Sequence, residues 1–144
     1  MRKLAFCLAA LLVLWVNASG QNTSSPTIVA KIQLFNQTGV VSPTTIFTPS
    51  TTGMYRVSTV IVLTQANGTT DSNAYYWGQL SFNYARTSGQ ADATYPLYVT
   101  KLSASSGVTV VMSSAGQPIS FFTTSGGGDI TNTKYNVYIE VEKL

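Results

Sequence analysis

Apolar and polar side chains alternate along most of the chain after its first 26 residues, and this period of two constrains the fold more than any other feature. The clearest run spans residues 55–64, where Tyr55, Val57, Ile61 and Leu63 share one face of an extended strand. No segment in this region keeps the 3.6-residue spacing of a helix over three turns. The pattern therefore predicts an all-β chain whose strands each bury one face.

The alternating segments are short and are separated by clusters of Gly, Pro, Ser and Asn. Their number, about seven, and their spacing are typical of an all-β, two-sheet antiparallel β-sandwich with jelly-roll topology. The run Gly126–Gly128 is predicted to be a loop, because no Gly-Lys-Ser/Thr follows to cradle a phosphate. We expect strands at 28–35, 55–64, 75–84, 95–102, 108–112, 119–123 and 135–142.

The first 20 residues have the layout of a secretory signal peptide. Basic Arg2 and Lys3 precede an apolar run of 13 residues from Leu4 to Val16, and small residues follow up to Gly20. The run is shorter than the roughly 20 residues of a spanning helix. Cleavage after Ala18 and cleavage after Gly20 both fit, and the alternative is a buried helix of the fold. We expect a signal peptide at 1–20, a polar lead-in at 21–26 and a single jelly-roll domain at 27–144.

Removal of the signal changes what the charge and the cysteine count imply. Two of the eight basic residues leave with it, so six basic residues face five acidic ones and the net charge is +1. The basic residues are scattered, which argues against nucleic-acid binding. Cys7, the single cysteine, lies in the expected signal. The secreted chain therefore makes no disulfide, and packing or oligomerisation has to stabilise it.

The residue types present leave little room for catalysis. The chain has no histidine, which removes His-based triads and most zinc sites, and no serine has a Gly-x-Ser-x-Gly context. Glu140 and Glu142 are a paired-carboxylate candidate, because their spacing of roughly 6.6 Å along a strand is near that of inverting glycosidases. The simpler interpretation is a pair of charges on a solvated face beside Lys143. We expect no enzyme activity, no catalytic residue and no cofactor.

Single acidic residues and glycosylation sequences are weaker features. Asp71, Asp92 and Asp129 each stand alone in an expected loop, so a calcium site using one of them with carbonyl oxygens remains open, and no metal ligand set is predicted. Three triplets fit the N-glycosylation pattern, at Asn22-Thr23-Ser24, Asn36-Gln37-Thr38 and Asn67-Gly68-Thr69.

Aromatic side chains on the non-core faces are candidates for a subunit interface. Tyr138 alternates away from its apolar neighbours, and Phe121 and Phe122 point to opposite faces of one strand. The ordinary alternative for each is packing within the chain. A jelly roll that associates with itself would bury such residues between subunits. The candidate interface residues are Tyr138 together with Phe121 or Phe122.

The segment Phe47-Thr-Pro-Ser-Thr-Thr-Gly53-Met-Tyr55-Arg-Val57 is the most specific motif. It resembles the Phe-x5-Gly-x-Tyr-x-Phe part of the signature of complement-type globular heads, which are relatives of the tumour necrosis factor superfamily. Val57 replaces the last Phe. The chain also looks like small secreted bacterial proteins that carry this jelly roll. In physical terms, we expect Pro49 to end strand pairing and Gly53 to permit a turn or a close backbone approach.

The resemblance implies a ten-stranded jelly roll that forms compact homotrimers and binds rather than catalyses. Phe47, Gly53, Tyr55 and Val57 would be the motif residues of its core. The leading function is a secreted module for self-assembly and for binding an extracellular protein or glycan. A structural component of a cell-surface coat or appendage is the alternative, and a glycan-acting enzyme is a third. We expect a secreted or extracellular location, with the cell surface or periplasm as variants, and no membrane span in the mature chain.

Overall fold

The computed structural model describes residues 25–68, 73–84 and 87–144, and the expected signal peptide lies outside these residues. The described part is built of strands, and it contains no helix that is long and apolar enough to cross a membrane. Its nine strands are β1 (Thr27–Gln37), β2 (Thr44–Phe47), β3 (Gly53–Gln65), β4 (Tyr75–Tyr84), β5 (Thr87–Asp92), β6 (Leu97–Tyr98), β7 (Ala104–Ser113), β8 (Ile119–Gly126) and β9 (Lys134–Lys143).

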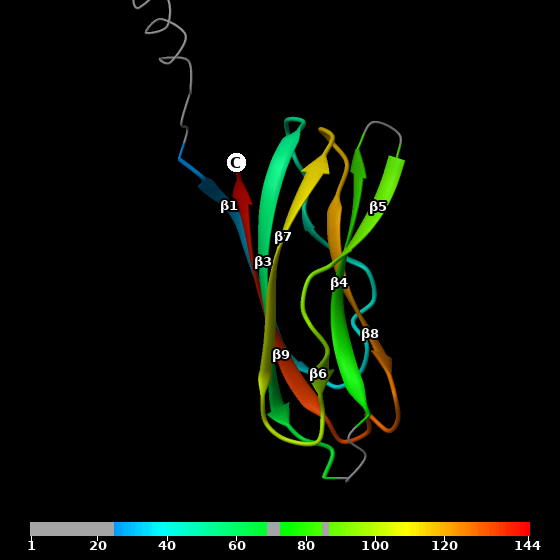
Figure 1. Ribbon diagram of the computed structural model, residues 1–144. Coiled ribbons are helices and arrows are strands. Elements are labelled where there is room, and N and C mark those ends of the chain that lie inside the picture. Colours follow the sequence, from blue (N-terminus) through cyan, green and yellow to red (C-terminus); the bar gives the residue numbers. More distant parts are fainter. Residues whose placement is uncertain (1–24, 69–72, 85–86) are drawn as a thin grey trace, which may run out of the picture.

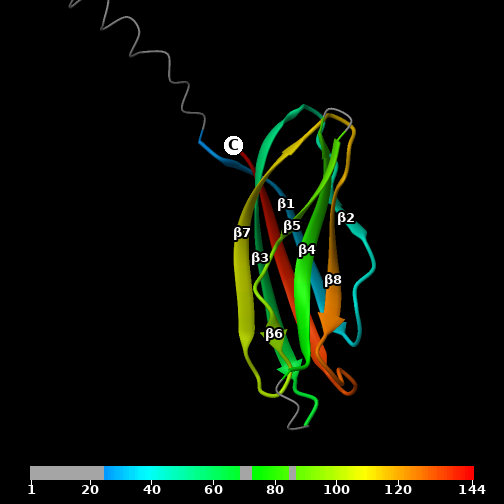
Figure 2. The same cartoon turned by 45° about the vertical axis from the view of Figure 1, so that its right-hand side comes forward.

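The strands form two antiparallel sheets that face each other (Figure 1). The first sheet has the order β1-β9-β3-β7 and is called the β3 sheet below. The second has the order β2-β8-β4-β5, with β6 paired to β4, and is called the β4 sheet. Figure 2 shows β2, in cyan, beside β8 at one margin of the β4 sheet.

The pairing is nested from the outside of the chain inward. β1 pairs with β9, β2 with β8, β3 with β7 and β4 with β5. A long antiparallel hairpin that rolls up into two sheets produces this order, which is jelly-roll topology. The fold class expected from the alternation is therefore confirmed. The resemblance implied ten strands, whereas the described residues contain nine.

The core lies between the two sheets and is lined by the inward residues of each strand. On β3 the buried residues are Tyr55, Val57, Ile61 and Leu63, with Thr59 between them. These side chains alternate with more exposed neighbours, because β3 is paired on both sides in the β3 sheet and only one of its faces meets the other sheet. The period of two thus places an unbroken row of side chains in the core.

Two buried tyrosines have their hydroxyl groups satisfied inside the core. The Tyr76 and Tyr135 rings pack with centroids 4.5 Å apart. The Tyr135 hydroxyl donates to the carbonyl of Gly39 over 2.6 Å and bonds the Thr123 hydroxyl over 2.9 Å, and Tyr76 bonds the Thr133 hydroxyl over 2.8 Å. Burial raises the pKa of Tyr135 to about 12, and it raises the pKa of Tyr76 as well.

Three strand predictions are corrected by the structure. The expected strand at 95–102 is reduced to β6, because Pro96 has no N–H for a ladder and the N–H groups of Ala93 and Thr94 both donate to the carbonyl of Gly78. Strands β2 and β5 were not predicted. β5 reads Thr-Ser-Gly-Gln-Ala-Asp and carries no apolar alternation, so only its pairing with β4 defines it.

Two local features also depart from the simple pattern. Ile28 begins the alternating run of the first strand, but it is exposed, because a register shift between Ile28 and Ala30 turns it outward. Gly53 was expected to serve a turn or a close approach. It is instead the first residue of β3, it lies outside the left-handed region, and a Cβ built on it would meet nothing within 4 Å. Pairing of β2 does stop at Phe47, before Pro49.

Candidate assembly surface

The outer face of the β3 sheet is the candidate functional surface, and its position follows from the alternation of its strands. On each strand, the residues between the buried ones point away from the core. We call this surface the assembly face. Its members are Lys31, Gln33 and Phe35 of β1, Met54, Arg56, Ser58 and Val60 of β3, Val108, Val110 and Met112 of β7, and Tyr138, Glu140 and Glu142 of β9.

Strand register aligns these residues in rows across the sheet. Val60 of β3 lies opposite Tyr138 of β9, and Tyr138 lies opposite Gln33 of β1. Two residues along, Ser58 lies opposite Glu140, and Glu140 opposite Lys31. The assembly face is therefore one continuous surface with contributions from all four strands.

Large apolar side chains are exposed on this face. Phe35 keeps 51% of its surface accessible and Val108 keeps 65%, while Met54, Val60, Val110 and Met112 are exposed as well. Met54 lies opposite Met112 across the β3–β7 pair, so that end of the face is apolar on neighbouring strands. Single exposed apolar residues are ordinary on protein surfaces, but a set gathered on one sheet face is typical of an interaction surface.

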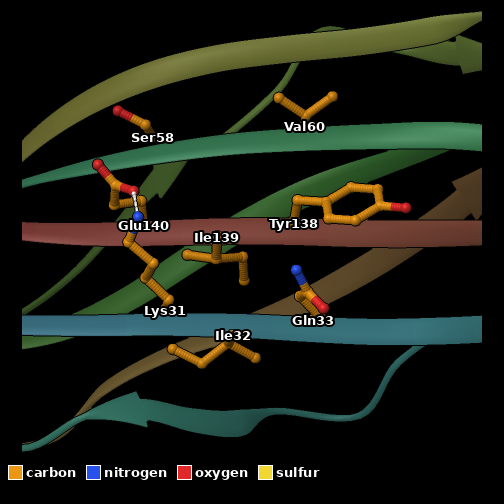
Figure 3. Close-up of a pocket in the computed structure, with 8 residues that line it drawn as sticks. All are labelled: Lys31, Ile32, Gln33, Ser58, Val60, Tyr138, Ile139 and Glu140. Carbon is orange, nitrogen blue, oxygen red and sulfur yellow. Dashed lines mark ion pairs between the residues drawn. The ribbon is translucent and has the colours of Figure 1, made fainter.

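Two ion pairs separate the apolar side chains of the assembly face. Lys31 Nζ lies 2.8 Å from a carboxylate oxygen of Glu140, as Figure 3 shows, and Arg56 Nε donates a short hydrogen bond to Glu142. The hydrogen bond from Arg56 lowers the pKa of Glu142. The charges of this face are thus matched within the chain, which leaves it nearly neutral to an approaching surface.

The ion pairs bear on the paired-carboxylate hypothesis for Glu140 and Glu142. A glycosidase of the inverting type needs one carboxyl group with a raised pKa to donate a proton. The pKa of Glu142 is lowered instead, and Glu140 forms an ion pair with Lys31. These two acids therefore have the environment of structural ion-pair partners.

A hollow of about 370 Å³ lies on the same face, and Figure 3 shows the residues that line it. Val60, Tyr138 and Gln33 form the row on one side, and Ser58 and the Lys31–Glu140 pair form the row on the other. The Tyr138 ring also meets the edge of Phe35 with centroids 6.0 Å apart. Tyr138 therefore lies on the outer face of the β3 sheet beside this hollow.

The other two candidate interface residues are not brought to this face. Phe121 is completely buried in the core, so it has no surface to offer a second subunit. Phe122 points outward from β8, opposite Gln79 of β4, and thus lies on the outer face of the β4 sheet. Tyr138 and Phe122 consequently face away from each other across the sandwich.

The motif residues lie around the start of β3. Tyr55 and Val57 are fully buried, and Phe47 packs against Tyr55 with ring centroids 5.4 Å apart. The Tyr55 hydroxyl donates to the carbonyl of Thr51 over 2.7 Å, which ties the β2–β3 connection to the strand. Gly53 contributes backbone only. The segment thus joins the two sheets through aromatic packing.

Several assembly-face residues were missed by sequence reasoning. Val108, Val110 and Met112 were recognised only as part of a strand, and Phe35 and Met54 were not singled out. The apolar side chains of β7 lie mainly on its outer face, since Val111 is the one apolar residue among its inward positions. Alternation alone would therefore place Val108, Val110 and Met112 on the core face of this strand.

The remaining candidate residues give no metal site in the part of the chain that the structure describes, where no group of three His, Cys, Asp or Glu is gathered. Asp129 accepts hydrogen bonds from the N–H and the hydroxyl of Thr131, and these bonds lower its pKa. Asp71 and the sequence triplet at Asn22 lie outside the described residues. Asn36 is exposed in the left-handed conformation, with φ 54°.

Comparisons with known proteins give a likeness in structure and none in sequence. No protein-family model matches the chain, and no curated protein sequence matches it. Among solved structures, the chain is similar to that of Eiger TNF from S. frugiperda, with 13% sequence identity, a TM-score of 0.45, and coverage of 80% of this chain and 85% of that chain. The jelly-roll assignment stands on the strand order and register described above.

Proposed function

We propose that this protein is a secreted, non-enzymatic jelly-roll module that assembles into homotrimers through the assembly face and binds an extracellular ligand. The observation that carries the proposal is the gathering of exposed apolar side chains on the outer face of the β3 sheet, where Tyr138 lies beside Phe35 and Val60. The resemblance of the motif at Phe47–Val57 to complement-type heads and tumour necrosis factors favours the same assembly.

Energetics favour covering this face. Contact between copies would remove apolar area from water at roughly 25 cal/mol for each Å². The expected secreted chain has no disulfide and a net charge of +1, so it gains from such burial and suffers little repulsion between copies. The two internal ion pairs leave few unmatched charges to desolvate.

A closed trimer needs two different patches on each copy, because a threefold axis relates head-to-tail contacts. The assembly face supplies one patch. The other patch would lie on the neighbouring copy outside the assembly face. An open polymer built from the same contact would instead fit a coat or appendage component.

Light scattering on the purified protein tests the assembly. We expect a mass three times that of one chain that does not grow with concentration. Tyr138→Asp should dissociate the trimer, because a carboxylate would be buried without a partner in an apolar contact. Tyr138→Phe keeps the ring and is the matched control, which should remain trimeric.

Three results would contradict the proposal. A mass of one chain at high concentration would show that the protein is a monomer. A mass that rises continuously with concentration would show that it forms an open polymer. A trimer that persists in Tyr138→Asp would place the contact elsewhere on the surface.

A further inference from the structure

A second surface feature, separate from the centre of the assembly face, lies where the β5–β6 connection crosses β7. A pocket of about 260 Å³ opens there between Trp77 of β4, the segment from Asp92 to Pro96, and Gly107 and Val108 of β7. None of its lining residues is basic. Its size suits one ring of a ligand rather than a whole drug-sized molecule, for which pockets start near about 300 Å³.

The segment that forms the pocket is held from both sheets. Ser105 donates to the carbonyl of Tyr95, and Thr109 donates to the carbonyl of Asp92 over 2.7 Å. Between these two hydroxyl residues, Gly107 lets the segment lie against β7, because a Cβ there would be 2.4 Å from the carbonyl oxygen of Ala93. From the other side, Gly78 accepts hydrogen bonds from Ala93 and Thr94.

This rigid backbone presents an exposed aromatic ring. Tyr95 keeps 78% of its surface accessible, which is the largest value among the exposed apolar and aromatic side chains. Four hydrogen bonds fix the backbone of the segment that carries Tyr95. The side chain itself is not buried within the chain, so packing in the fold does not explain its position. A ring on a backbone that is already fixed loses little conformational entropy when a ligand packs on it.

Polar groups around the ring supply both acceptors and donors. The Asp92 carboxylate is exposed and has only a long contact of 3.5 Å with Gln79 among the described residues. The Thr94 hydroxyl oxygen accepts the N–H of Gly78 over 3.0 Å, which leaves its own proton for another bond. The Trp77 indole N–H is buried and has no partner in the described residues. This nitrogen has almost no accessible surface, so Trp77 lines the pocket with its other atoms.

From this arrangement we infer that the pocket binds a neutral saccharide ring. The aromatic faces of Tyr95 and Trp77 suit the C–H groups of a pyranose, and the Asp92 carboxylate suits its hydroxyl groups. The acidic residue and the lack of a basic one disfavour uronic and sulfated sugars. This inference specifies the ligand class of the proposed function and depends on its ligand-binding part. It also requires that the pocket, which shares Val108 with the assembly face, stays open in the assembled protein.

The test uses the secreted chain, in which Trp77 is the single tryptophan because Trp15 leaves with the signal peptide. Its one indole cross-peak in a ¹H–¹⁵N spectrum is followed while methyl glycosides of glucose, galactose and mannose and their disaccharides are added. At least one neutral sugar should shift the peak saturably, because Trp77 lines the pocket and a bound ring changes the surroundings of its indole. The corresponding glucuronide should bind more weakly, because the Asp92 carboxylate repels it.

Tyr95→Ala should weaken saccharide binding by roughly tenfold or more, and Asp92→Asn should raise the relative affinity for the glucuronide. Tyr98→Ala removes an exposed ring outside the pocket and is the matched control, which should bind as the parent does. Thermal unfolding of each variant separates lost binding from lost folding.

The inference is overturned if no neutral sugar moves the indole peak, or if Tyr95→Ala binds as the parent does. Preference for a peptide or for an anionic glycan would also overturn it. Light scattering on the same samples distinguishes this failure from failure of the proposed assembly. A trimer that does not bind sugars would contradict the saccharide site and leave the proposed assembly standing. A monomer that binds sugars would contradict the trimer and leave the saccharide site standing.

Discussion

At the scale of single residues, the core contains one hydroxyl group whose position costs stability. Thr59 is 1% exposed on the inner face of β3, and its hydroxyl has no hydrogen-bond partner among the described residues. Thr123, on the inner face of β8, is the opposite case, since its hydroxyl accepts the N–H of Val41 over 2.8 Å and bonds the Tyr135 hydroxyl. The two residues form a natural pair for measuring what a buried hydroxyl contributes.

Thr59→Val is expected to stabilise the protein by about 1 kcal/mol, because it replaces an unsatisfied polar group by a methyl group of similar shape. Thr123→Val is the control and should destabilise it by about 1–3 kcal/mol, since it leaves buried partners unsatisfied. Free energies of unfolding from denaturant titration check both. A loss of stability in Thr59→Val as large as that in Thr123→Val would mean that the Thr59 hydroxyl has a partner.

The buried phenol of Tyr135 predicts a dependence of stability on alkaline pH. Its pKa is raised from the model-compound value of 10.0 to about 12 by burial in the folded chain. Below pH 10 the phenol is neutral in both states and its contribution is fully present. As the pH rises from 10 toward 12, the unfolded chain loses this proton first, so folding stability falls by about 1.4 kcal/mol for each unit of pH.

Tyr135→Phe should make the decline between pH 10 and 12 shallower, which denaturant titrations at several pH values can measure. A residual slope is expected because the pKa of Tyr76 is also raised by burial. The variant also loses its bonds to Gly39 and Thr123, so it is less stable at neutral pH. An unchanged slope would show that Tyr135 is accessible to solvent in the folded protein.

At the scale of elements, β3 is the strand on which both the core and the candidate surface depend. It pairs with β7 on one side and with β9 on the other, and its register with both is continuous over most of its length. Its inner face packs in the core and its outer face forms the middle of the assembly face. A shift of register by one residue would exchange these two faces.

Ile61→Ala should destabilise the protein by about 2–5 kcal/mol, because Ile61 is fully buried and its truncation leaves a cavity. Thr64→Ala is the control on the same strand, where the side chain is exposed, and should change stability by no more than about 0.5 kcal/mol. Equal small effects at both positions in a denaturant titration would contradict the observed register.

At the scale of the whole molecule, the two outer faces of the sandwich differ in chemistry. The assembly face carries exposed valine, methionine and phenylalanine side chains with two internal ion pairs. The outer face of the β4 sheet presents mainly neutral polar residues, such as Gln79, Ser81 and Ser120, together with Trp77 and Phe122. This asymmetry favours a molecule that uses one side for assembly and leaves the rest to solvent and ligands.

The expected signal peptide also concerns the whole molecule, because its removal decides where the secreted chain begins. We expect the protein recovered from the extracellular medium to begin at Ser19 or Gln21, since the basic start, the apolar run and the small residues form a signal peptide. Intact-mass measurement checks this. Recovery of the chain with Met1 in a membrane fraction would contradict it.

Local pattern was sufficient for much of this molecule. The alternation of apolar residues predicted an all-β fold, the sandwich class and the buried row on β3, because the side-chain period of a strand is a property of a few neighbouring residues. It also predicted that Tyr138 faces outward. A strand such as β5, with no apolar alternation, has no such signal and was missed.

Tertiary structure alone decided how these pieces combine. Strand pairing joins residues such as Thr27 and Lys143 from opposite ends of the described chain, and no local pattern encodes which strands become neighbours. The choice between Phe121 and Phe122 depended on which face of β8 meets the core. The pocket at Tyr95 requires Gly107 to accept a backbone segment from the other side of the fold. Alternation defines two faces of a strand, but only packing against the rest of the chain determines which face is buried and which is left for a partner.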